Sequence, residues 1–124
     1  MARADMIREL RQMSYAVQEL EDGCISFPFA VTVGRFAGQT VTVGLLVGED
    51  WPFNPPSGPH ISPSLLPINP AAIWPHGGIH GPRCRPFMTG EFQYWSRPYP
   101  NWAGTKRSAR DYIAHLNMVF DALT

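Results

Sequence analysis

Proline and glycine divide this chain into parts with different capacities for regular structure. Most of the 13 prolines and most of the 11 glycines lie between residues 48 and 104. Proline fixes φ and lacks a backbone N–H, and glycine weakens helices and strands, so long regular elements are disfavoured in that region. We therefore expect most of the regular structure to come from residues 5–47 and from the C-terminal segment 108–124.

The overall composition limits the classes of protein to which the chain can belong. Its 124 residues suit a single domain, residues 1–124, that can bury a core without disulfide bonds. Ten basic and ten acidic side chains balance, so the chain lacks the basic excess of a general nucleic-acid binder. No apolar run reaches transmembrane length, and no apolar signal segment follows Met1. We therefore expect a cytoplasmic protein that binds neither nucleic acid nor a membrane, with Cys24 and Cys84 as free thiols.

The N-terminal segment has the period of an amphipathic helix. Asp5 is a candidate N-cap, and Gly23 can end the helix in a left-handed conformation. The charged residues Arg8, Glu9 and Arg11 are expected on the outer, exposed face. The pattern predicts a helix that starts near Asp5, ends near Gly23 and packs on a sheet. Its apolar stripe recurs at spacings of three and four: Met6, Leu10, Met13, Val17 and Leu20.

The next segment predicts an antiparallel hairpin. Residues 24–33 are rich in β-branched and aromatic side chains, and Pro28 places this strand at an edge or a bulge because proline cannot donate to a ladder. Residues 34–38 carry two glycines that can reverse the chain. Residues 60–65 form a candidate third strand. Residues 39–47 alternate, and their apolar face should cover the first helix: Val41, Val43, Leu45 and Val47.

The rest of the chain combines an aperiodic region with a final helix. Residues 67–104 show no period of 2 or 3.6, but their many aromatic side chains indicate a packed rather than a disordered segment. Ser108 and Asp111 have the spacing of a capping box. The order of elements predicts an α+β domain, in which an N-terminal helix and a C-terminal helix pack against an antiparallel β-meander. The final helix has the apolar stripe Tyr112, Ile113, Leu116, Val119, Phe120 and Leu123.

Residues 74–84 bring together a possible nucleophile and possible bases. They read Trp-Pro-His-Gly-Gly-Ile-His-Gly-Pro-Arg-Cys and contain His76, His80 and Cys84. The prolines and glycines exclude a helix or a long strand, so we expect an extended loop that leaves these side chains accessible. Loops held on a rigid scaffold commonly carry catalytic and binding residues.

The order of these features resembles that of the ubiquitin-conjugating enzyme (UBC-like) superfamily: helix, antiparallel meander, proline turn, His-Pro-Asn tripeptide, cysteine, tryptophan and helix. Residues 51–56, Trp-Pro-Phe-Asn-Pro-Pro, resemble the family's proline turn, and the Trp-Pro-His sequence that ends at His76 resembles its tripeptide. Cys84 follows His76 by eight residues, close to the family's spacing, and Trp95 or Trp102 matches its tryptophan.

The C-terminal part is similar to the compact bacterial branch of this superfamily. Residues 94–98 read Tyr-Trp-Ser-Arg-Pro and precede a helix with an acidic-Tyr-Ile-x-x-Leu pattern. Members of that branch are encoded beside ubiquitin-like modifiers, activating enzymes and deconjugating proteases, some of them in antiphage operons. This chain departs from the family in having three predicted strands in place of four, a changed tripeptide, and extra residues between the proline turn and the tripeptide.

The resemblance implies a conjugating enzyme. Cys84 would accept a ubiquitin-like modifier as a thioester from an activating-enzyme-like protein and pass it to an amine on a target protein, without a metal or organic cofactor. The thiolate is the nucleophilic form, and Arg83 and Arg85 favour it. His76 or His80 would donate to the oxyanion or assist deprotonation of the amine. The outer face of the first helix would bind the activating enzyme.

Other interpretations of the same residues stay open. Cys84 could be an ordinary loop thiol in a catalytically inactive UBC-like module, which would bind a modifier or a partner protein through the proline turn and the aromatic loop. The histidines could only brace the loop. His76, His80 and Cys84, with His60 as a fourth ligand, could instead bind zinc in a hydrolase, although they match no recognised ligand spacing. Cys24 begins a strand and is expected to be a small buried hydrophobe.

Overall fold

The computed structural model describes residues 2–63, 65, 79–80, 85–88, 92–95, 99 and 101–122. These residues form an α+β fold with a helix near each end of the chain and one antiparallel sheet, which confirms the predicted fold class. The helices are α1 (Arg3–Gln12) and α2 (Ala109–Asp121), and the 3-10 turns are η1 (Glu21–Gly23), η2 (Arg85–Phe87) and η3 (Trp102–Gly104). The strands are β1 (Gln18–Glu19), β2 (Cys24–Ala30), β3 (Thr40–Leu46), β4 (Ser57–Ser62), β5 (Ile79–His80) and β6 (Gln93–Trp95).

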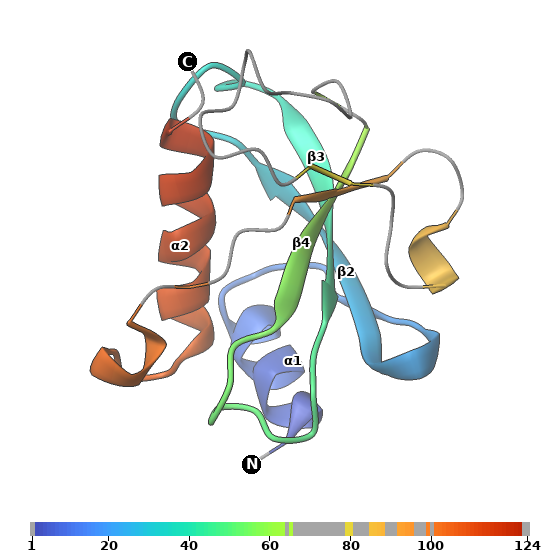
Figure 1. Ribbon diagram of the computed structural model, residues 1–124, viewed down its shortest axis with the longest axis vertical. Helices are drawn as coiled ribbons and strands as arrows, with labels where there is room; N and C mark the ends of the chain where they lie inside the picture. Colours follow the sequence, from blue (N-terminus) through green and yellow to red (C-terminus); the bar gives the residue numbers. More distant parts are fainter. Residues whose placement is uncertain are drawn as a thin grey trace.

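The sheet has more strands than the sequence predicts. Its order is β1-β2-β3-β4-β6-β5, so the first four strands form a meander in chain order and β6 lies between β4 and β5 (Figure 1). The prediction of three strands was incomplete because β1, β5 and β6 have only two, two and three residues. Elements of that length cannot display a period. The third predicted strand, residues 60–65, is β4 and begins three residues earlier, at Ser57.

The β2–β3 hairpin is confirmed, and its strands pair along their whole length. Gly34 and Gly38 in its turn have φ values of 79° and 94°, which glycine adopts readily. Gly34 is also required by its surroundings, because a Cβ there would collide with the carbonyl oxygen of Phe120. The turn therefore sets how closely the hairpin approaches the end of α2.

Pro28 lies within β2, and the hydrogen-bond ladder explains why it is tolerated. The Val31 amide donates to the Gln39 carbonyl, and the Val31 carbonyl accepts from the turn, so odd-numbered residues of β2 bond to β3. The backbone groups of the even-numbered residues of β2 point away from β3, toward β1. β1 pairs only with Ile25 and Ser26, so it does not extend as far as Pro28. The predicted edge strand is therefore corrected: β2 lies between β1 and β3, and only its part at Pro28, where the N–H is missing, has no partner from β1.

The first helix is shorter than its periodicity predicts. α1 ends after ten residues, and Ser14 has a φ of 73°, which is outside the helical region. The ring of Tyr15 then lies 5.1 Å from that of Phe27 in β2, so a tertiary contact replaces the continuing helix. Val17 is buried from a non-helical segment, and Leu20 is 36% exposed.

The predicted ends of this helix are also corrected. Ala2 is the N-cap, and Asp5 lies at the third helical position, where its carboxylate accepts the Ala2 amide at 2.7 Å. Gly23 has a φ of 78°, but it closes η1 before β2 rather than α1. The sequence correctly indicated that Asp5 lies near a helix start and that Gly23 adopts a positive φ. It did not show which position Asp5 takes or which element Gly23 ends.

The second helix agrees with its prediction. Ser108 is the N-cap of α2: its hydroxyl accepts the Asp111 amide at 3.2 Å, and the Asp111 carboxylate accepts the Ser108 amide at 3.0 Å. The hydrogen bonds from the Ser108 side chain and backbone lower the pKa of Asp111. Leu123, the last residue of the predicted stripe, lies outside the described residues. The buried residues are Ala109, Tyr112, Ile113, His115, Leu116, Val119 and Phe120.

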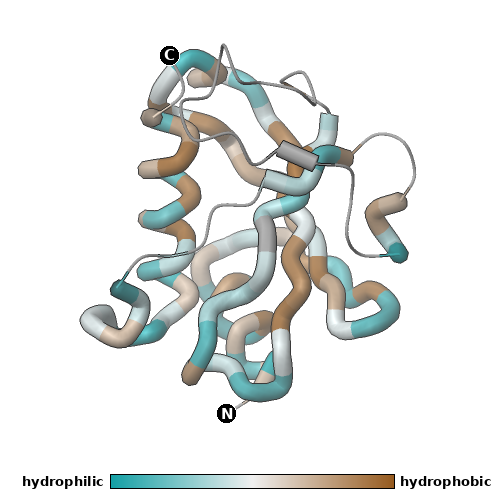
Figure 2. The backbone as a smooth tube through the Cα atoms, viewed as in Figure 1, coloured by the Kyte–Doolittle hydropathy of each residue, from teal (hydrophilic) through white to brown (hydrophobic). Residues whose placement is uncertain are grey.

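Both helices pack on the same face of the sheet. One buried cluster contains Met6 and Leu10 of α1, Leu116 and Phe120 of α2, and the odd-numbered residues of β2 and β3. Figure 2 shows apolar segments in the central strands and alternating apolar and polar segments along α2. The even-numbered residues of β2 and β3 belong to the opposite face.

Candidate functional site

The face of the sheet opposite the helices contains a row of small and polar residues. In register, Ser26 lies opposite Gly44, Gly44 opposite His60, and His60 opposite Tyr94. Residues directly opposite in antiparallel strands share a face, so these four positions lie together. The backbone of His80, one of the predicted catalytic histidines, pairs with Tyr94 and is the fifth position of the row.

A single side chain from η2 covers part of this row. Phe87 is 1% exposed, and its ring centroid lies 4.7 Å from that of His60 and 4.9 Å from that of Phe92. Gly44 makes room for the ring, because a Cβ there would lie 2.6 Å from it. Phe87 and Phe92 also pack with Cys24 in a cluster separate from the main core. We call Cys24, Gly44, His60, Phe87 and Phe92 the second-face cluster.

His60 is the polar member of the second-face cluster. It is 0% exposed, and its Nδ1 lies 3.2 Å from the Gly44 carbonyl oxygen. A carbonyl can only accept, so this contact places a proton on Nδ1. Burial lowers the pKa of His60 to about 4, and the hydrogen bond to Gly44 opposes part of that shift. The imidazole is therefore uncharged at neutral pH.

The predicted site residues differ in what the structure describes of them. Cys84 and His76 lie outside the described residues, so their roles stay predictions. His80 is placed in β5, at the edge of the sheet. In the described part of the chain, no group of three or more His, Cys, Asp or Glu could hold a metal ion. His60, the suggested fourth zinc ligand, is buried against Phe87.

The other cysteine is confirmed as a buried residue. Cys24 is 1% exposed, and its Sγ lies 3.8 Å from the Asp22 carbonyl oxygen. Buried thiols in apolar surroundings are unreactive. Cys24 is therefore an internal control for thiol chemistry at Cys84.

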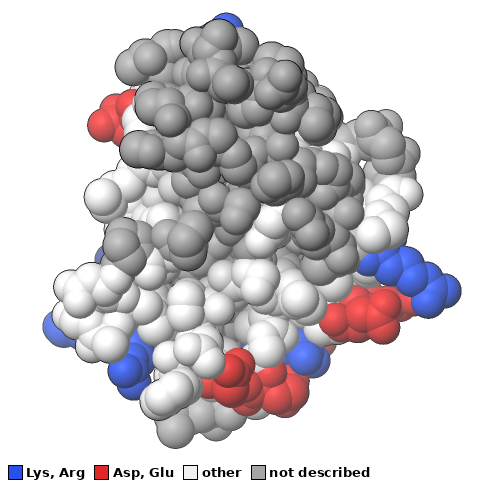
Figure 3. Space-filling view, in the orientation of Figure 1, with Lys and Arg blue, Asp and Glu red and all other residues white. Residues whose placement is uncertain are grey.

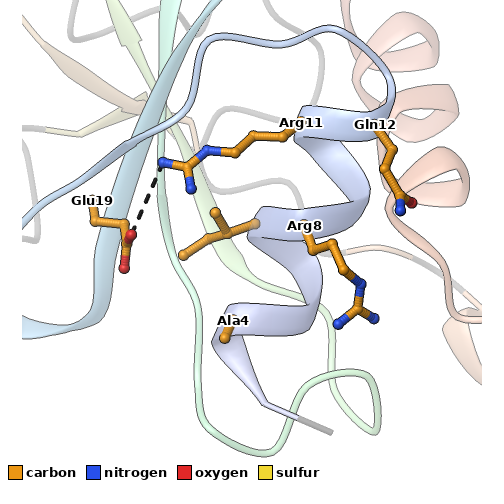
Figure 4. Close-up of a pocket in the computed structure, with 6 residues that line it drawn as sticks. Ala4, Arg8, Arg11, Gln12 and Glu19 are labelled. Carbon is orange, nitrogen blue, oxygen red and sulfur yellow. Dashed lines mark ion pairs between the residues drawn. The ribbon is translucent and has the colours of Figure 1, made fainter.

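The outer face of α1 and the strand β1 border a shallow hollow of about 420 Å³. Figure 4 shows Arg11 reaching from α1 toward Glu19, whereas Arg8 points away from that pair. The Arg11 guanidinium lies 3.9 Å from the Glu19 carboxylate and donates to the Val17 carbonyl at 3.0 Å, and Arg8 pairs with Asp5 at 2.8 Å. The surface combines exposed cations with apolar side chains. The lining residues are Ala4, Ile7, Arg8, Arg11, Gln12 and Glu19.

The prediction that Glu9 lies exposed beside these arginines is wrong. Its Oε1 accepts the Ala109 amide at the start of α2 at 2.9 Å, and its Oε2 accepts from the Trp51 indole at 3.4 Å. Unpaired amides and the helix dipole favour a carboxylate at a helix N-terminus. Periodicity identified the apolar side of α1, but it could not identify a polar contact between helices. Glu9 therefore joins α1, α2 and the proline turn.

The proline turn has a rigid base and an exposed tip. Trp51 and Trp102 are 1% and 6% exposed, and their ring centroids lie 5.5 Å apart. The Trp102 indole donates to the Pro52 carbonyl at 2.9 Å. Phe53 is 66% exposed, and the guanidinium carbon of Arg107 lies 5.2 Å from its ring centroid. The turn therefore presents one aromatic ring to solvent.

On the face shown in Figure 3, acidic and basic side chains lie close together along the lower part. Their totals are equal over the whole chain. No helix among the described residues is long and apolar enough to cross a membrane.

The sequence analysis did not assign the tertiary contacts of three residues, Gly44, Phe87 and Glu9. Only Gly44 interrupts a sequence pattern in a way that could have indicated its contact. Gly44 interrupts the alternation of β3, and a glycine inside a strand indicates the close approach of another group. Phe87 had no such signal, because it lies in a region without a period. Glu9 had none, because its partner Ala109 is 100 residues away.

Comparisons with known proteins found no relative: no family model matches the chain, and no curated protein or solved structure matches it either. The described residues establish an α+β fold whose sheet carries two helices on one face and an aromatic cluster on the other.

Proposed function

We propose that this chain is a UBC-like domain that carries a ubiquitin-like modifier as a thioester on Cys84 and transfers it to an amine of a target protein. The order of elements carries this proposal. An N-terminal helix precedes an antiparallel meander, a proline turn held by tryptophans connects β3 to β4 within that meander, and a C-terminal helix packs on the same face as the first. Cys84 lies between the meander and that last helix.

The proposed reaction needs no metal or organic cofactor, because the thioester already supplies an activated carbonyl. The Cys84 thiolate attacks the modifier's carbonyl, a new C–S bond forms, and the activating enzyme's thiol leaves. An amine of the target then attacks, loses a proton and releases the Cys84 thiol. Arg83 and Arg85 favour the thiolate. His76 and His80 are the candidates for stabilising the oxyanion or accepting the amine's proton.

The proposed partners are an activating-enzyme-like protein, the modifier and the target. The hollow beside Arg8 and Arg11 supports docking of the activating enzyme, because it combines exposed cations with the apolar side chains of Ala4 and Ile7. We place the protein in the bacterial cytoplasm, within a conjugation system of the type found in antiphage operons. Genes for a modifier and an activating enzyme next to this one would support that setting.

A loading reaction tests the proposal. With the cognate activating enzyme, the modifier and ATP, the wild-type protein should gain one modifier through a bond cleaved by reducing agent. Cys84→Ser should convert it to an ester that resists reductant and is cleaved by hydroxide. His76→Ala should still load but should discharge more slowly to an amine, because exchange between thiols needs less oxyanion stabilisation.

The control uses the second cysteine. Cys24→Ser should still form the reducible adduct, because the buried Cys24 is not the proposed nucleophile and a serine hydroxyl there can donate to the Asp22 carbonyl. Circular dichroism and thermal unfolding establish that each variant is folded. A folded wild-type protein that never forms the reducible adduct rules out Cys84 as the nucleophile.

A non-catalytic UBC-like binding module is the second candidate, and the exposed ring of Phe53 favours it. A large aromatic side chain on a rigid base is typical of interface anchors. In that case Phe53→Ala should weaken binding of the modifier or partner protein by roughly tenfold or more. Cys84→Ser should leave that affinity unchanged. Calorimetric titration of both variants distinguishes the two functions.

A further inference from the structure

The exposed tip of the proline turn lies beside a group of cations. The guanidinium carbon of Arg107 is 5.2 Å from the centroid of the Phe53 ring, which is 66% exposed. Lys106 precedes Arg107, Arg110 follows it in the first turn of α2, and both are exposed. Figure 3 shows basic side chains near η3 and the start of α2, which Figure 1 locates. We call Phe53, Lys106, Arg107 and Arg110 the cationic patch.

The acidic groups close to the cationic patch already have other hydrogen-bond partners. Among the described residues, the ion pairs involve none of the three cations of the patch. Glu9 lines a hollow of about 210 Å³ together with Arg110, but its two oxygens accept from a backbone amide and an indole. The Asp111 carboxylate accepts from Ser108 at the cap of α2. The patch therefore keeps positive charge available to a partner.

Arg107 is held in an unusual state. Its φ is 53°, in the left-handed region that arginine rarely adopts. Its Nε atom is buried and has no hydrogen-bond partner in the part of the chain that the structure describes. Backbone outliers of this kind are concentrated at binding and catalytic sites. A partly desolvated guanidinium also attracts a carboxylate more strongly than an exposed one does, because water screens the contact less.

The cationic patch has a rigid support. The Trp102 indole donates to the carbonyl of Pro52, directly before Phe53. The Thr105 hydroxyl donates to the Trp102 carbonyl at 2.8 Å and accepts from the Arg107 amide at 2.9 Å. Phe53 and Arg107 are thus both connected to Trp102, so binding of a partner has little backbone order to impose.

We propose that the cationic patch binds an acidic segment of a partner protein. Carboxylates of the segment pair with Arg107 and Arg110, and an apolar side chain beside them packs on the Phe53 ring. The segment is short and its carboxylates are separated, because Glu9 borders the same hollow as Arg110 and repels a continuous polyanion. The inference needs no chemistry at Cys84, so it holds or fails independently of thioester transfer.

Selection from a random peptide library displayed on phage tests the chemistry of the partner. On immobilised wild-type protein, the enriched peptides should contain Asp or Glu next to an aromatic or aliphatic residue. A fluorescein-labelled copy of an enriched peptide then serves as the probe in anisotropy titrations, and its affinity should fall as salt is added. The proposal is overturned if no peptide is enriched, if the enriched peptides lack acidic residues, or if a single-stranded oligonucleotide of equal charge binds more tightly.

Arg107→Asn separates binding from stability. Asparagine adopts a positive φ more readily than arginine, so the variant should keep or raise the melting temperature. The dissociation constant of the labelled peptide should nevertheless rise by about tenfold or more. Arg110→Glu is the second variant, because its exposed position tolerates substitution, and it should weaken binding to a similar extent. Wild-type affinity in either folded variant would contradict the proposal.

The matched control is Arg35→Asn. Arg35 is an exposed arginine in the hairpin turn, and its guanidinium carbon lies 5.4 Å from the centroid of the Phe36 ring. This variant removes the same charge and the same kind of ring contact away from the cationic patch, so the dissociation constant should not change. A loss of affinity in Arg35→Asn equal to that in Arg107→Asn would show that overall charge, rather than the patch, attracts the peptide.

Discussion

The two faces of the sheet are built in different ways. On the face that carries the helices, large apolar side chains occupy alternate positions and are buried against α1 and α2. On the other face, the neighbouring positions hold Ser26, Gly44 and His60, and the ring of Phe87 lies above Gly44 and against His60. Strand β3 therefore contributes apolar side chains to the main core on one face, and on the other face it provides Gly44 for the contact with Phe87.

The helix-facing side of the sheet mainly stabilises the fold, whereas the second-face cluster mainly sets the position of η2. A continuous core gains stability in proportion to the apolar area that many side chains remove from water. A single ring over a glycine adds less area, but it specifies where a short turn lies. We therefore expect substitutions on the helix-facing side to act mainly on the free energy of unfolding, and substitutions in the second-face cluster to act also on local geometry and pH dependence.

The largest loss of stability should come from the helix-facing side. Ile61 is 0% exposed in the main core, next to His60 in β4. Ile61→Ala should lower the free energy of unfolding by about 2–5 kcal/mol, because it removes buried methylenes and leaves a cavity. Thr42→Ala, on the opposite face and half-buried, should change it by less than about 0.5 kcal/mol. Equal losses in urea titrations of the two variants would contradict the comparison.

Acidification should reveal the buried histidine of the second face. His60 has an ordinary pKa of 6.5, and burial lowers it to about 4 in the folded protein. Between these values the unfolded chain binds more protons, so stability falls as the pH decreases from about 7 to 4, by roughly 3 kcal/mol from this residue. His60→Phe keeps an aromatic ring and should remove that part of the slope. Urea titrations at several pH values measure it; parallel slopes for both proteins would reject the assignment.

The contact between the two helices should have an intermediate effect. Glu9→Ala leaves the Ala109 amide and the Trp51 indole without their acceptor, and should lower the free energy of unfolding by about 1–2 kcal/mol. Glu9→Gln keeps one acceptor oxygen and should lose less. Chemical unfolding of the two variants measures the difference in their free energies of unfolding. If Glu9→Gln lowers this free energy as much as Glu9→Ala does, the charge of Glu9 matters more than its role as a hydrogen-bond acceptor.

One substitution in the core should stabilise the protein. The Tyr112 hydroxyl is buried and has no hydrogen-bond partner among the described residues, and burial raises its pKa. Tyr112→Phe removes a polar group whose burial is unfavourable, so the free energy of unfolding should rise by about 1 kcal/mol. Tyr99→Phe, which changes a half-exposed residue, should have little effect. A loss of stability in Tyr112→Phe would indicate a hydrogen bond to this hydroxyl.

The smallest effect on stability should come from the outer face of α1. Reversing the charges of Arg8 and Arg11 should change the free energy of unfolding by less than about 1 kcal/mol, because their ion pairs are exposed. Modifier loading should nevertheless slow at low salt, and the difference should shrink as salt is added. Arg35→Glu, in the exposed hairpin turn, is the control. Unchanged loading kinetics would remove this surface from the proposal.

The parts of the fold that were predicted correctly depend on local patterns. The β2–β3 hairpin follows from the alternation of residues 39–47 and a glycine turn, and α2 follows from the Ser108 cap and a stripe of spacing three and four. The end of α1 was missed because the Tyr15 contact with Phe27 is not local. The short strands β1, β5 and β6 were missed because two or three residues carry no period.

The candidate site was predicted less completely than the fold. The burial of Cys24 followed from its place in a strand, and the structure confirms it. Residues 74–84 were selected for their composition, and of these the structure describes only the backbone of Ile79 and His80. The roles of Cys84 and His76 therefore stay predictions that the loading reaction tests.

By itself, the sequence determined the α+β class, the hairpin and the final helix, because alternation, turn glycines and capping act between residues close in the chain. Only the tertiary structure decided that Phe87 fills the space above Gly44, that His60 is buried and uncharged, and that Glu9 accepts the Ala109 amide. Each of these contacts joins separate elements. Burial, and the pKa shift that follows from it, arises only when those elements pack together.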